Sequence, residues 1–353
     1  ISVPEQPSDS VDPSLSEKNE VVAADQPEDK EASGQQETES SGVLTVAAKD
    51  AGLDGAVQVE KDVNVDKDTT VRAEERLGDY ARRYIKAASK GDIQAKFYLG
   101  YMYENGEHVV KDLFSAKKWY RDAAEMAHVK AMIRLASLLG EDPEATEWFR
   151  KAAEKGDPDA QAMIAFRYES GTGTEINLNE AVVWYTKAAE QDHVNAQFNL
   201  AIMYDVGEGI AEDDEQALKW YARAAEQGHS DSQLSLGIIY ENGDGVEVDM
   251  GAAMRWYRRA ADQGHRDAQY AIALMLDEGI GLPEDNTAAI DWYTRAAKQG
   301  DAMAQNNLGA MYDEGEGTSM NDKEAVKWYR LSANQGNTIA QNNLGAMYFA
   351  GEG

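Results

Sequence analysis

The feature that most constrains this chain is the spacing of its tryptophans. All seven lie on one grid, and the intervals between neighbours are 29, 36, 36, 36, 36 and 36 residues. Six are followed by Tyr and one by Phe: Trp119, Trp148 (before Phe149), Trp184, Trp220, Trp256, Trp292 and Trp328. Chance does not place every Trp of a protein on one grid, so the chain is an array of repeats. Each unit of such an array packs only on its neighbours, and length is therefore a poor guide to the number of domains.

Each unit carries two apolar stripes with helical spacing. Residues of the first stripe recur at i, i+4, i+7 and i+8, which is one face of a helix. In the last complete unit the two stripes are Ala304, Leu308, Met311 and Tyr312, and then Ala325, Trp328, Tyr329, Ser332 and Ala333. The Trp–Tyr pair stands beside Ala at helical spacing, so we interpret it as core rather than as an aromatic ligand box. The pattern predicts an all-α fold with essentially no strand.

Glycines and capping residues mark the ends of these helices. Gly243, Gly279 and Gly315 follow the first helix of their units, where a left-handed residue is favoured because glycine has no Cβ to clash. An Asp or Asn side chain should cap the start of the second helix, and the candidates are Asp213, Asp249, Asp285 or Asn286, and Asp322. A small residue such as Gly237 or Gly309 follows the central Leu and predicts a close approach of two helices.

Composition and register divide the chain into three segments. Residues 1–72 contain no aromatic residue, four of the seven prolines, and 17 acidic against six basic side chains. We expect a disordered acidic tail there, because the segment has too few apolar side chains for their burial to offset the conformational entropy lost on folding. Residues 73–94 are predicted to be an N-terminal capping helix, with Arg83 at the Trp position. Residues 95–353 are predicted to hold seven repeats, the second one short, and then a half repeat.

These residues resemble a known family. The consensus A-Q-x-x-L-G-x-M-Y-x-x-G-x-G-x-x-x-D-x-x-x-A-x-x-W-Y-x-x-A-A-x-x-G is similar to the Sel-one-like repeat, a relative of the tetratricopeptide repeat. The chain departs from it at His108, Ala127 and Asp192, which replace loop glycines, and in the short second unit. The resemblance implies antiparallel helix pairs that stack in a right-handed superhelix with a concave face. It also implies adaptor roles, in which the array holds other proteins together.

The favoured function is therefore a non-catalytic scaffold or adaptor that binds a peptide or protein segment on its concave face. The alternative is a repeat-fold hydrolase or penicillin-binding enzyme. Cysteine-rich members of the family have been linked to that activity, but they carry paired cysteines and this chain has none. No nucleophile–base pair or phosphate-binding loop stands out, so we expect no catalytic residue and no cofactor. We also expect no metal site, because His128, His193, His229 and His265 recur about 10 Å apart, the spacing of helix layers.

Charge narrows the partners. The formal charge is −30, so nucleic acid and anionic membranes are disfavoured. No apolar run approaches the roughly 20 residues of a membrane span. Residues 73–353 keep a net charge of −19, which favours a partner with basic residues. Lack of cysteine does not fix the compartment, and we favour a periplasmic or secreted location over a cytoplasmic one.

Ten positions are candidate partner contacts, since they lie on the first helices outside the repeating core pattern. In tetratricopeptide-like stacks that helix lines the concave face. The candidates are Phe97, Tyr98, Tyr101, Phe198, Asn199, Tyr270, Asn306, Asn307, Asn342 and Asn343. Aromatic rings supply contact area at low entropic cost, and Asn amides both donate to and accept from a peptide backbone. Packing against the adjacent repeat is the alternative role for Phe97, Phe198 and Tyr270.

The two ends of the sequence carry one further expectation. The chain starts at Ile1 without Met and stops at Gly353 inside a repeat, so we interpret it as a fragment or a processed segment. The half repeat from Ala340 would leave Leu344, Met347 and Tyr348 awaiting a partner helix, and self-association through this edge is expected.

Overall fold

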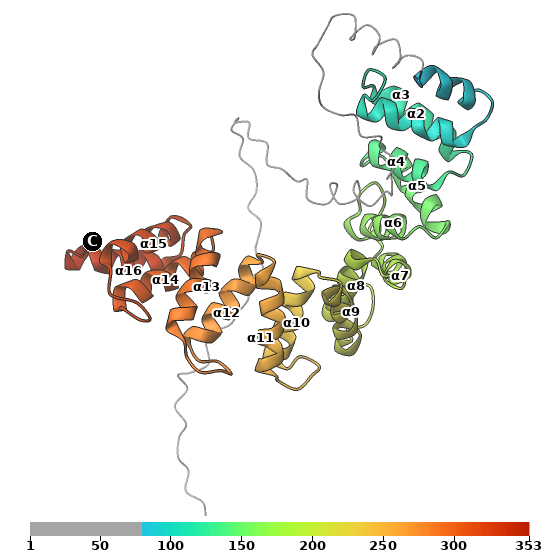
Figure 1. The fold of residues 1–353 in the computed structure, drawn as a ribbon. Coiled ribbons are helices and arrows are strands. Elements are labelled where there is room, and N and C mark those ends of the chain that lie inside the picture. The colour runs from blue at the N-terminus through green and yellow to red at the C-terminus, as the bar shows by residue number, and fades with distance from the viewer. Residues whose placement is uncertain (1–79, 353) are drawn as a thin grey trace, which may run out of the picture. The chain divides into compact units, whose positions relative to one another are not determined.

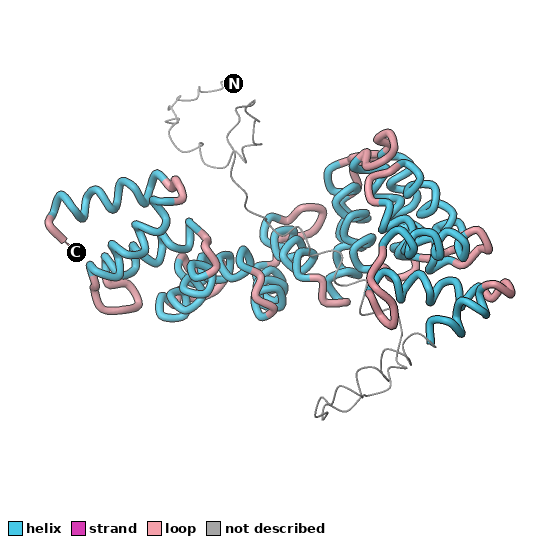
Figure 2. The backbone as a smooth tube through the Cα atoms, turned by 90° about the horizontal axis from the view of Figure 1, so that it is seen from above, coloured by secondary structure: helices cyan, strands magenta, loops and turns pink. Residues whose placement is uncertain are grey.

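The computed structural model describes residues 80–352. The predicted acidic tail (1–72) and the first residues of the predicted capping helix (73–79) lie outside this range. Residues 80–88 are helical, and the elements that follow are α2 (Ile93–Asn105), α3 (Leu113–Ala124), α4 (Val129–Leu139), α5 (Pro143–Glu154), α6 (Pro158–Ser170), α7 (Leu178–Ala189), α8 (Val194–Val206), α9 (Asp214–Glu226), α10 (Ser230–Asn242), α11 (Met250–Asp262), α12 (Arg266–Asp277), α13 (Asn286–Lys298), α14 (Ala302–Glu314), α15 (Asp322–Asn334) and α16 (Thr338–Ala350). Helices and loops alternate throughout this range, without a strand (Figure 2).

The helices pack as consecutive pairs. Even-numbered helices are the first helix of a unit and odd-numbered helices the second. The two helices of a unit contact each other, and the second helix also contacts the first helix of the next unit (Figure 1). The described residues thus form the all-α solenoid predicted by the repeats.

Capping follows the predicted pattern with one shift. Asp213, Asp249 and Asp285 accept backbone N–H bonds at the starts of α9, α11 and α13. The cap of α15 is Asn321, one residue before the predicted Asp322, which is already the first helical residue. Asn321 is the cap because its backbone is not yet helical and its Oδ1 accepts from the N–H of Glu324 at 3.2 Å.

Three loops keep the repeat geometry without the usual glycine. His108, Ala127 and Asp192 have φ angles of 61°, 66° and 62°, in the left-handed region that the glycines of other units occupy. The turn conformation is therefore the same at these three positions as in the other units. The energetic cost of a left-handed backbone falls here on a residue that is not glycine.

The core of the regular units contains buried Tyr and Ala side chains beside the Trp. Tyr185, Tyr257 and Tyr293 are almost completely buried. The small residue after the central Leu faces this tyrosine: a Cβ added to Gly309 would lie 2.7 Å from Cδ1 of Tyr329. The close approach predicted for two helix backbones is thus an approach of one backbone to a tyrosine ring.

A buried row of glutamines joins neighbouring units. In the units that begin with α6, α8, α10, α12 and α14, a Gln near the start of the first helix donates its Nε2 to a carbonyl of the preceding second helix, as Gln197 does to Ala189 at 3.0 Å. Its Oε1 accepts from a Gln at the end of its own unit's second helix, as Gln197 does from Gln227 at 2.8 Å. Gln197 is completely buried, so satisfying both ends of its amide is a condition for packing.

The short unit is closed by an arginine. Its second helix starts at Pro143, as predicted, and the shortened loop leaves backbone carbonyls beside α6. Arg167 is 4% exposed and donates to the carbonyls of Gly140 (2.9 Å) and Asp142 (3.2 Å) and to Oγ1 of Thr146 (2.8 Å). Met203 and Met311 stand at this position in regular units, where the apolar side chain packs in the core instead.

Candidate binding surfaces

The ten predicted contact residues fall into three groups along the first helices. The aromatic group on α2 is mainly packed inward. Phe97 is 8% exposed, stacks on the His128 ring at 4.6 Å and lies 5.7 Å from the Tyr120 ring. Tyr98 is partly exposed and meets the Tyr84 ring edge at 5.6 Å, and the partly exposed Tyr101 donates to Glu107 at 3.5 Å.

The second group lies on α8. Phe198 is partly buried, with its ring 4.6 Å from His229 and 6.0 Å from Tyr221. Asn199 donates its amide to the hydroxyl of Tyr185 at 3.0 Å. Phe97 and Phe198 therefore both pack on the histidine that begins the next unit, which is the packing role named as their alternative.

The third group spans three units. Asn307 donates to the hydroxyl of Tyr293 at 3.0 Å, Asn306 donates to Asn307 at 3.2 Å, and Asn343 donates to Asn306 at 3.3 Å. The Tyr270 ring lies 5.9 Å from the Tyr293 ring. We call Tyr270, Tyr293, Asn306, Asn307 and Asn343 the amide cluster. Asn306 is buried, Tyr270, Asn307 and Asn343 are partly exposed, and Asn342 is exposed beside the cluster.

The amide cluster is one copy of a longer polar row. In most units a carboxylate near the end of the first helix accepts a bond from the tyrosine hydroxyl of the second helix, as Glu169 does from Tyr185 at 2.6 Å and Asp277 from Tyr293 at 3.0 Å. Burial and the neighbouring carboxylate raise the pKa of Tyr185 well above its usual value, so the hydroxyl stays a proton donor. Asn199 and Asn307 then extend this pair into the next unit.

The acid–tyrosine pairing was not anticipated from the residues, although the signal is present. The acid lies sixteen residues before the tyrosine in each copy that forms the bond. In the short unit the first helix ends at Leu139 and Gly140 stands at the position of the acid, and the tyrosine is replaced by Phe149, which needs no acceptor. Desolvation also raises the pKa of Asp277.

The recurrent histidines are helix caps. Nδ1 of His128 and of His193 accepts the backbone N–H of Ala131 and of Ala196, both at 3.1 Å. Nε2 of His193 lies 3.4 Å from Asp159 in the preceding unit, and Nε2 of His265 lies 3.0 Å from Asp231. Within residues 80–352 no group of three or more His, Asp or Glu side chains is placed to hold a metal ion. Nor does any helix in that range combine the length and apolar character needed to cross a membrane.

Comparison with known proteins establishes the family. The Sel1 repeat family matches eight consecutive segments, 93–128, 129–157, 158–193, 194–229, 230–265, 266–301, 302–337 and 338–353. The chain therefore belongs to the Sel1 repeat family, and proteins of this family generally act as protein-interaction scaffolds.

Two solved structures share both fold and sequence with the chain. A protective antigen present in uropathogenic Escherichia coli strains is 30% identical with a TM-score of 0.71, over 82% of this chain and 68% of that one. A Sel1 repeat protein from Oxalobacter formigenes is 34% identical with a TM-score of 0.67, over 81% of this chain and 83% of that one.

Curated relatives match over shorter stretches. An uncharacterised protein of Neisseria meningitidis is 35% identical over 96 residues, which are 27% of this chain and 21% of that protein. A chitin synthase regulator of Saccharomyces cerevisiae is 34% identical over 108 residues, or 28% of this chain and 16% of the regulator. The chain thus spans about a fifth of the length of these relatives.

Proposed function

We propose that the chain is a non-catalytic scaffold that binds a peptide or protein segment across the first-helix face of α12, α14 and α16. The observation that carries the proposal is the amide cluster, which brings hydrogen-bonding groups of three units to one partly exposed patch. Amides that both donate and accept suit an extended peptide backbone, whose own groups alternate in the same way.

The proposed segment carries basic residues. Carboxylates of Asp277 and Asp313 lie on the same polar row, each accepting a bond from a tyrosine hydroxyl. Together with the net charge of −19 over residues 73–353, they favour Lys and Arg side chains on the partner and speed its encounter with the array.

The test is a double variant, Asn307→Ala with Asn343→Ala. Ala271 occupies the same position in its own unit, so alanine is compatible with the fold there. The matched control is Ser235→Ala, at the same position two units earlier than Asn307. Phage-displayed peptides that bind the full chain and are lost on the double variant should be rich in Lys and Arg. They should bind the double variant about tenfold more weakly or worse, and the control normally, with helical content unchanged. Equal binding by the double variant would move the site to the second-helix face or to the acidic tail.

The enzyme alternative has its own readout. A chromogenic β-lactam incubated with the full chain should be hydrolysed no faster than in buffer, because we assign no nucleophile or general base. Hydrolysis above that background would contradict the non-catalytic scaffold and favour the hydrolase.

Self-association through α16 is a further part of the proposal. Tyr348 and Phe349 are 51% and 95% exposed, and apolar surface of this kind gains from being covered by another copy. Met347, in contrast, is already buried at 2% exposure, so the expected edge is confined to its neighbours. Replacing Tyr348 and Phe349 with Ser should shift sedimentation toward the monomer; an unchanged profile of a monomeric parent protein would end this idea.

A further inference from the structure

Trp256 differs from four of the tryptophans in the 36-residue units, whereas Trp119, in the first unit, is also only partly buried. Trp184, Trp220, Trp292 and Trp328 are between 5% and 8% exposed, whereas Trp256 is only partly buried. Its tyrosine neighbour, Tyr257, is buried like the others, so the helix itself is seated normally. The difference must therefore come from what covers the indole ring.

At two other tryptophans a side chain outside the repeat consensus contacts the ring. One comes from four residues earlier on the same helix: Glu144 accepts the indole N–H of Trp148 at 3.0 Å. The other comes from the preceding unit: the guanidinium of Arg258 lies 5.2 Å from the ring centre of Trp292. These two positions are both alanine for Trp256 alone, as Ala252 and Ala222.

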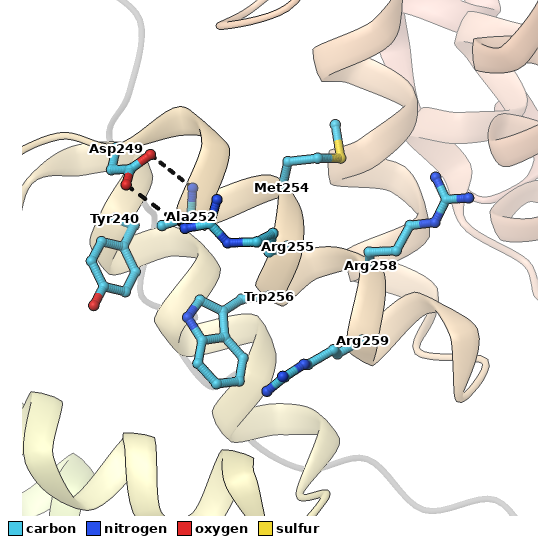
Figure 3. A pocket seen from close by; sticks show the side chains of 8 residues that line it. All are labelled: Tyr240, Asp249, Ala252, Met254, Arg255, Trp256, Arg258 and Arg259. Carbon is cyan, nitrogen blue, oxygen red and sulfur yellow. Dashed lines mark hydrogen bonds and ion pairs between the residues drawn. The ribbon is translucent and has the colours of Figure 1, made fainter.

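The missing cover leaves a hollow over Trp256. Its volume is about 520 Å³, and it is lined by Tyr240, Asp249, Ala252, Met254, Arg255, Trp256, Arg258 and Arg259. We call this the Trp256 hollow. Figure 3 shows the indole at its centre, Tyr240 on one side and Arg259 along the ring. Its walls come from α10, α11 and the loop between them only, so it is an open surface hollow, suited to a side chain of another protein rather than to an enclosed small molecule.

Three arginines surround this hollow in a chain that has 64 acidic and 34 basic residues. Arg259 lies 4.5 Å from the ring centre of Trp256. Arg255 has Asp249 at 3.9 Å, and its side chain is 72% exposed, which makes this a weak pair. In the described part of the chain neither Arg258 nor Arg259 has a carboxylate within ion-pair distance. Guanidinium groups held beside an aromatic ring are suited to bind carboxylates.

We propose that the Trp256 hollow binds an acidic peptide segment of another protein. A carboxylate of the segment pairs with Arg259 and Arg255, and an adjacent apolar or aromatic side chain covers the indole of Trp256. This site lies on the second-helix side of its unit and takes the opposite charge from the segment proposed for the amide cluster. The array thereby holds two partners of unlike charge, as a scaffold that joins two proteins requires.

The decisive variant is Ala222→Arg. It copies the cover that Arg258 provides for Trp292, so it fills the hollow while adding a positive charge. A phage-displayed peptide pool is selected on the full chain and counter-selected on this variant. We expect the peptides lost on the variant to carry Asp or Glu beside an aromatic or aliphatic residue. A synthetic copy of one of them should bind Ala222→Arg and Trp256→Ala at least about tenfold more weakly.

A charge-matched pair separates the hollow from its surroundings. Ala252→Glu places a carboxylate at the exposed ring, while Ala288→Glu places one four residues before Trp292, whose ring Arg258 already covers. The first should abolish binding of the acidic peptide and the second should leave it within about twofold, with the same helical content.

Three results would overturn the proposal. The first is that no peptide discriminates Ala222→Arg from the parent chain, and the second is that the discriminating peptides are basic. The third is loss of binding in Arg255→Gln with Arg259→Gln but full binding in Ala222→Arg, which would mean a charged patch without a hollow. The Asn307→Ala, Asn343→Ala variant should bind the acidic peptide normally, so failure of this site and failure of the amide cluster are distinguishable.

Discussion

Trp220 and Trp256 occupy the same position in adjacent units, yet Trp220 is buried in the core and Trp256 forms the floor of a surface hollow. Trp220 is 5% exposed and has Arg223 4.9 Å from its ring centre. Trp256 also has an arginine near its ring centre, at 4.5 Å. The two positions that could cover its ring are, however, occupied by Ala252 and Ala222, which are too small to do so. Both rings stand at the same position of their units, and these two alanine positions are the ones that supply Glu144 to Trp148 and Arg258 to Trp292. In a regular solenoid, a surface hollow can thus form at one unit where both positions that could cover the tryptophan ring are occupied by alanine.

The largest expected effect tests this difference directly. The repeat alone predicts the same loss for both tryptophans, about 3–5 kcal/mol on replacement by Ala. The structure keeps that value for Trp220→Ala, which opens a buried cavity, and lowers it for Trp256→Ala to about 2 kcal/mol, because that ring is only partly buried. Urea denaturation of the two variants measures both. Equal losses would show that Trp256 is as buried as Trp220.

The next effect concerns the contact between the short unit and the unit after it, where Arg167 on α6 replaces the methionine that stands at this position as Met203 and Met311. Arg167→Met should lower stability by about 2–3 kcal/mol, because the carbonyls of Gly140 and Asp142 lose their donor inside the protein. Met203→Leu, at the same position of a regular unit, should cost less than about 1.5 kcal/mol. A loss for Arg167→Met no greater than for Met203→Leu would mean that water replaces the guanidinium.

A third comparison sets Ala127 against Gly228, which end second helices with φ angles of 66° and 94°. Ala127→Gly should stabilise the protein by roughly 0.5–1 kcal/mol, since it relieves a left-handed alanine. Gly228→Ala should destabilise it by a similar or larger amount, although nothing lies within 4 Å of the added Cβ. Thermal denaturation of both variants shows whether each change raises or lowers the stability. A destabilising effect of Ala127→Gly would contradict the assignment of backbone strain to Ala127.

The smallest effect is a pH dependence confined to the units capped by histidine. Burial lowers the pKa of His128 and of His229, whose Nδ1 atoms accept helix N–H groups and must stay unprotonated. As pH falls below the unfolded value of about 6.5, the unfolded chain binds these protons first. Stability is therefore full above that value and is lost until the lowered folded pKa values are reached.

The variant His128→Asp with His229→Asp removes this dependence, because Asp157 and Asp301 already cap other units in the same way. Groups facing His229 are Asp231 and His265, and they are kept. Melting temperatures between about pH 7.5 and 5.5 should fall less in the variant than in the parent. Parallel curves would show that the caps do not titrate in this range.

The sequence by itself determined the architecture, because the information is local and repeated. Trp at a fixed interval, Gly after each helix and Asp or Asn before it predict helix pairs, and the Asn321 cap differs from prediction by one residue only. Even the replaced glycines at Ala127 and Asp192 keep the expected backbone, since stacking of whole units outweighs a cost of about 1 kcal/mol in one turn.

Only the tertiary structure decided which of these residues face one another. Asn306, Asn307 and Asn343 were chosen as a surface pattern, but the bond from Asn343 to Asn306 and the bond from Asn307 to Tyr293 each join two units. The same holds for Arg167 and for Trp256, since position 222 of the preceding unit is alanine where Trp292 has Arg258. A consensus describes one unit at a time, whereas burial and hydrogen bonding at these positions are properties of the contact between two units.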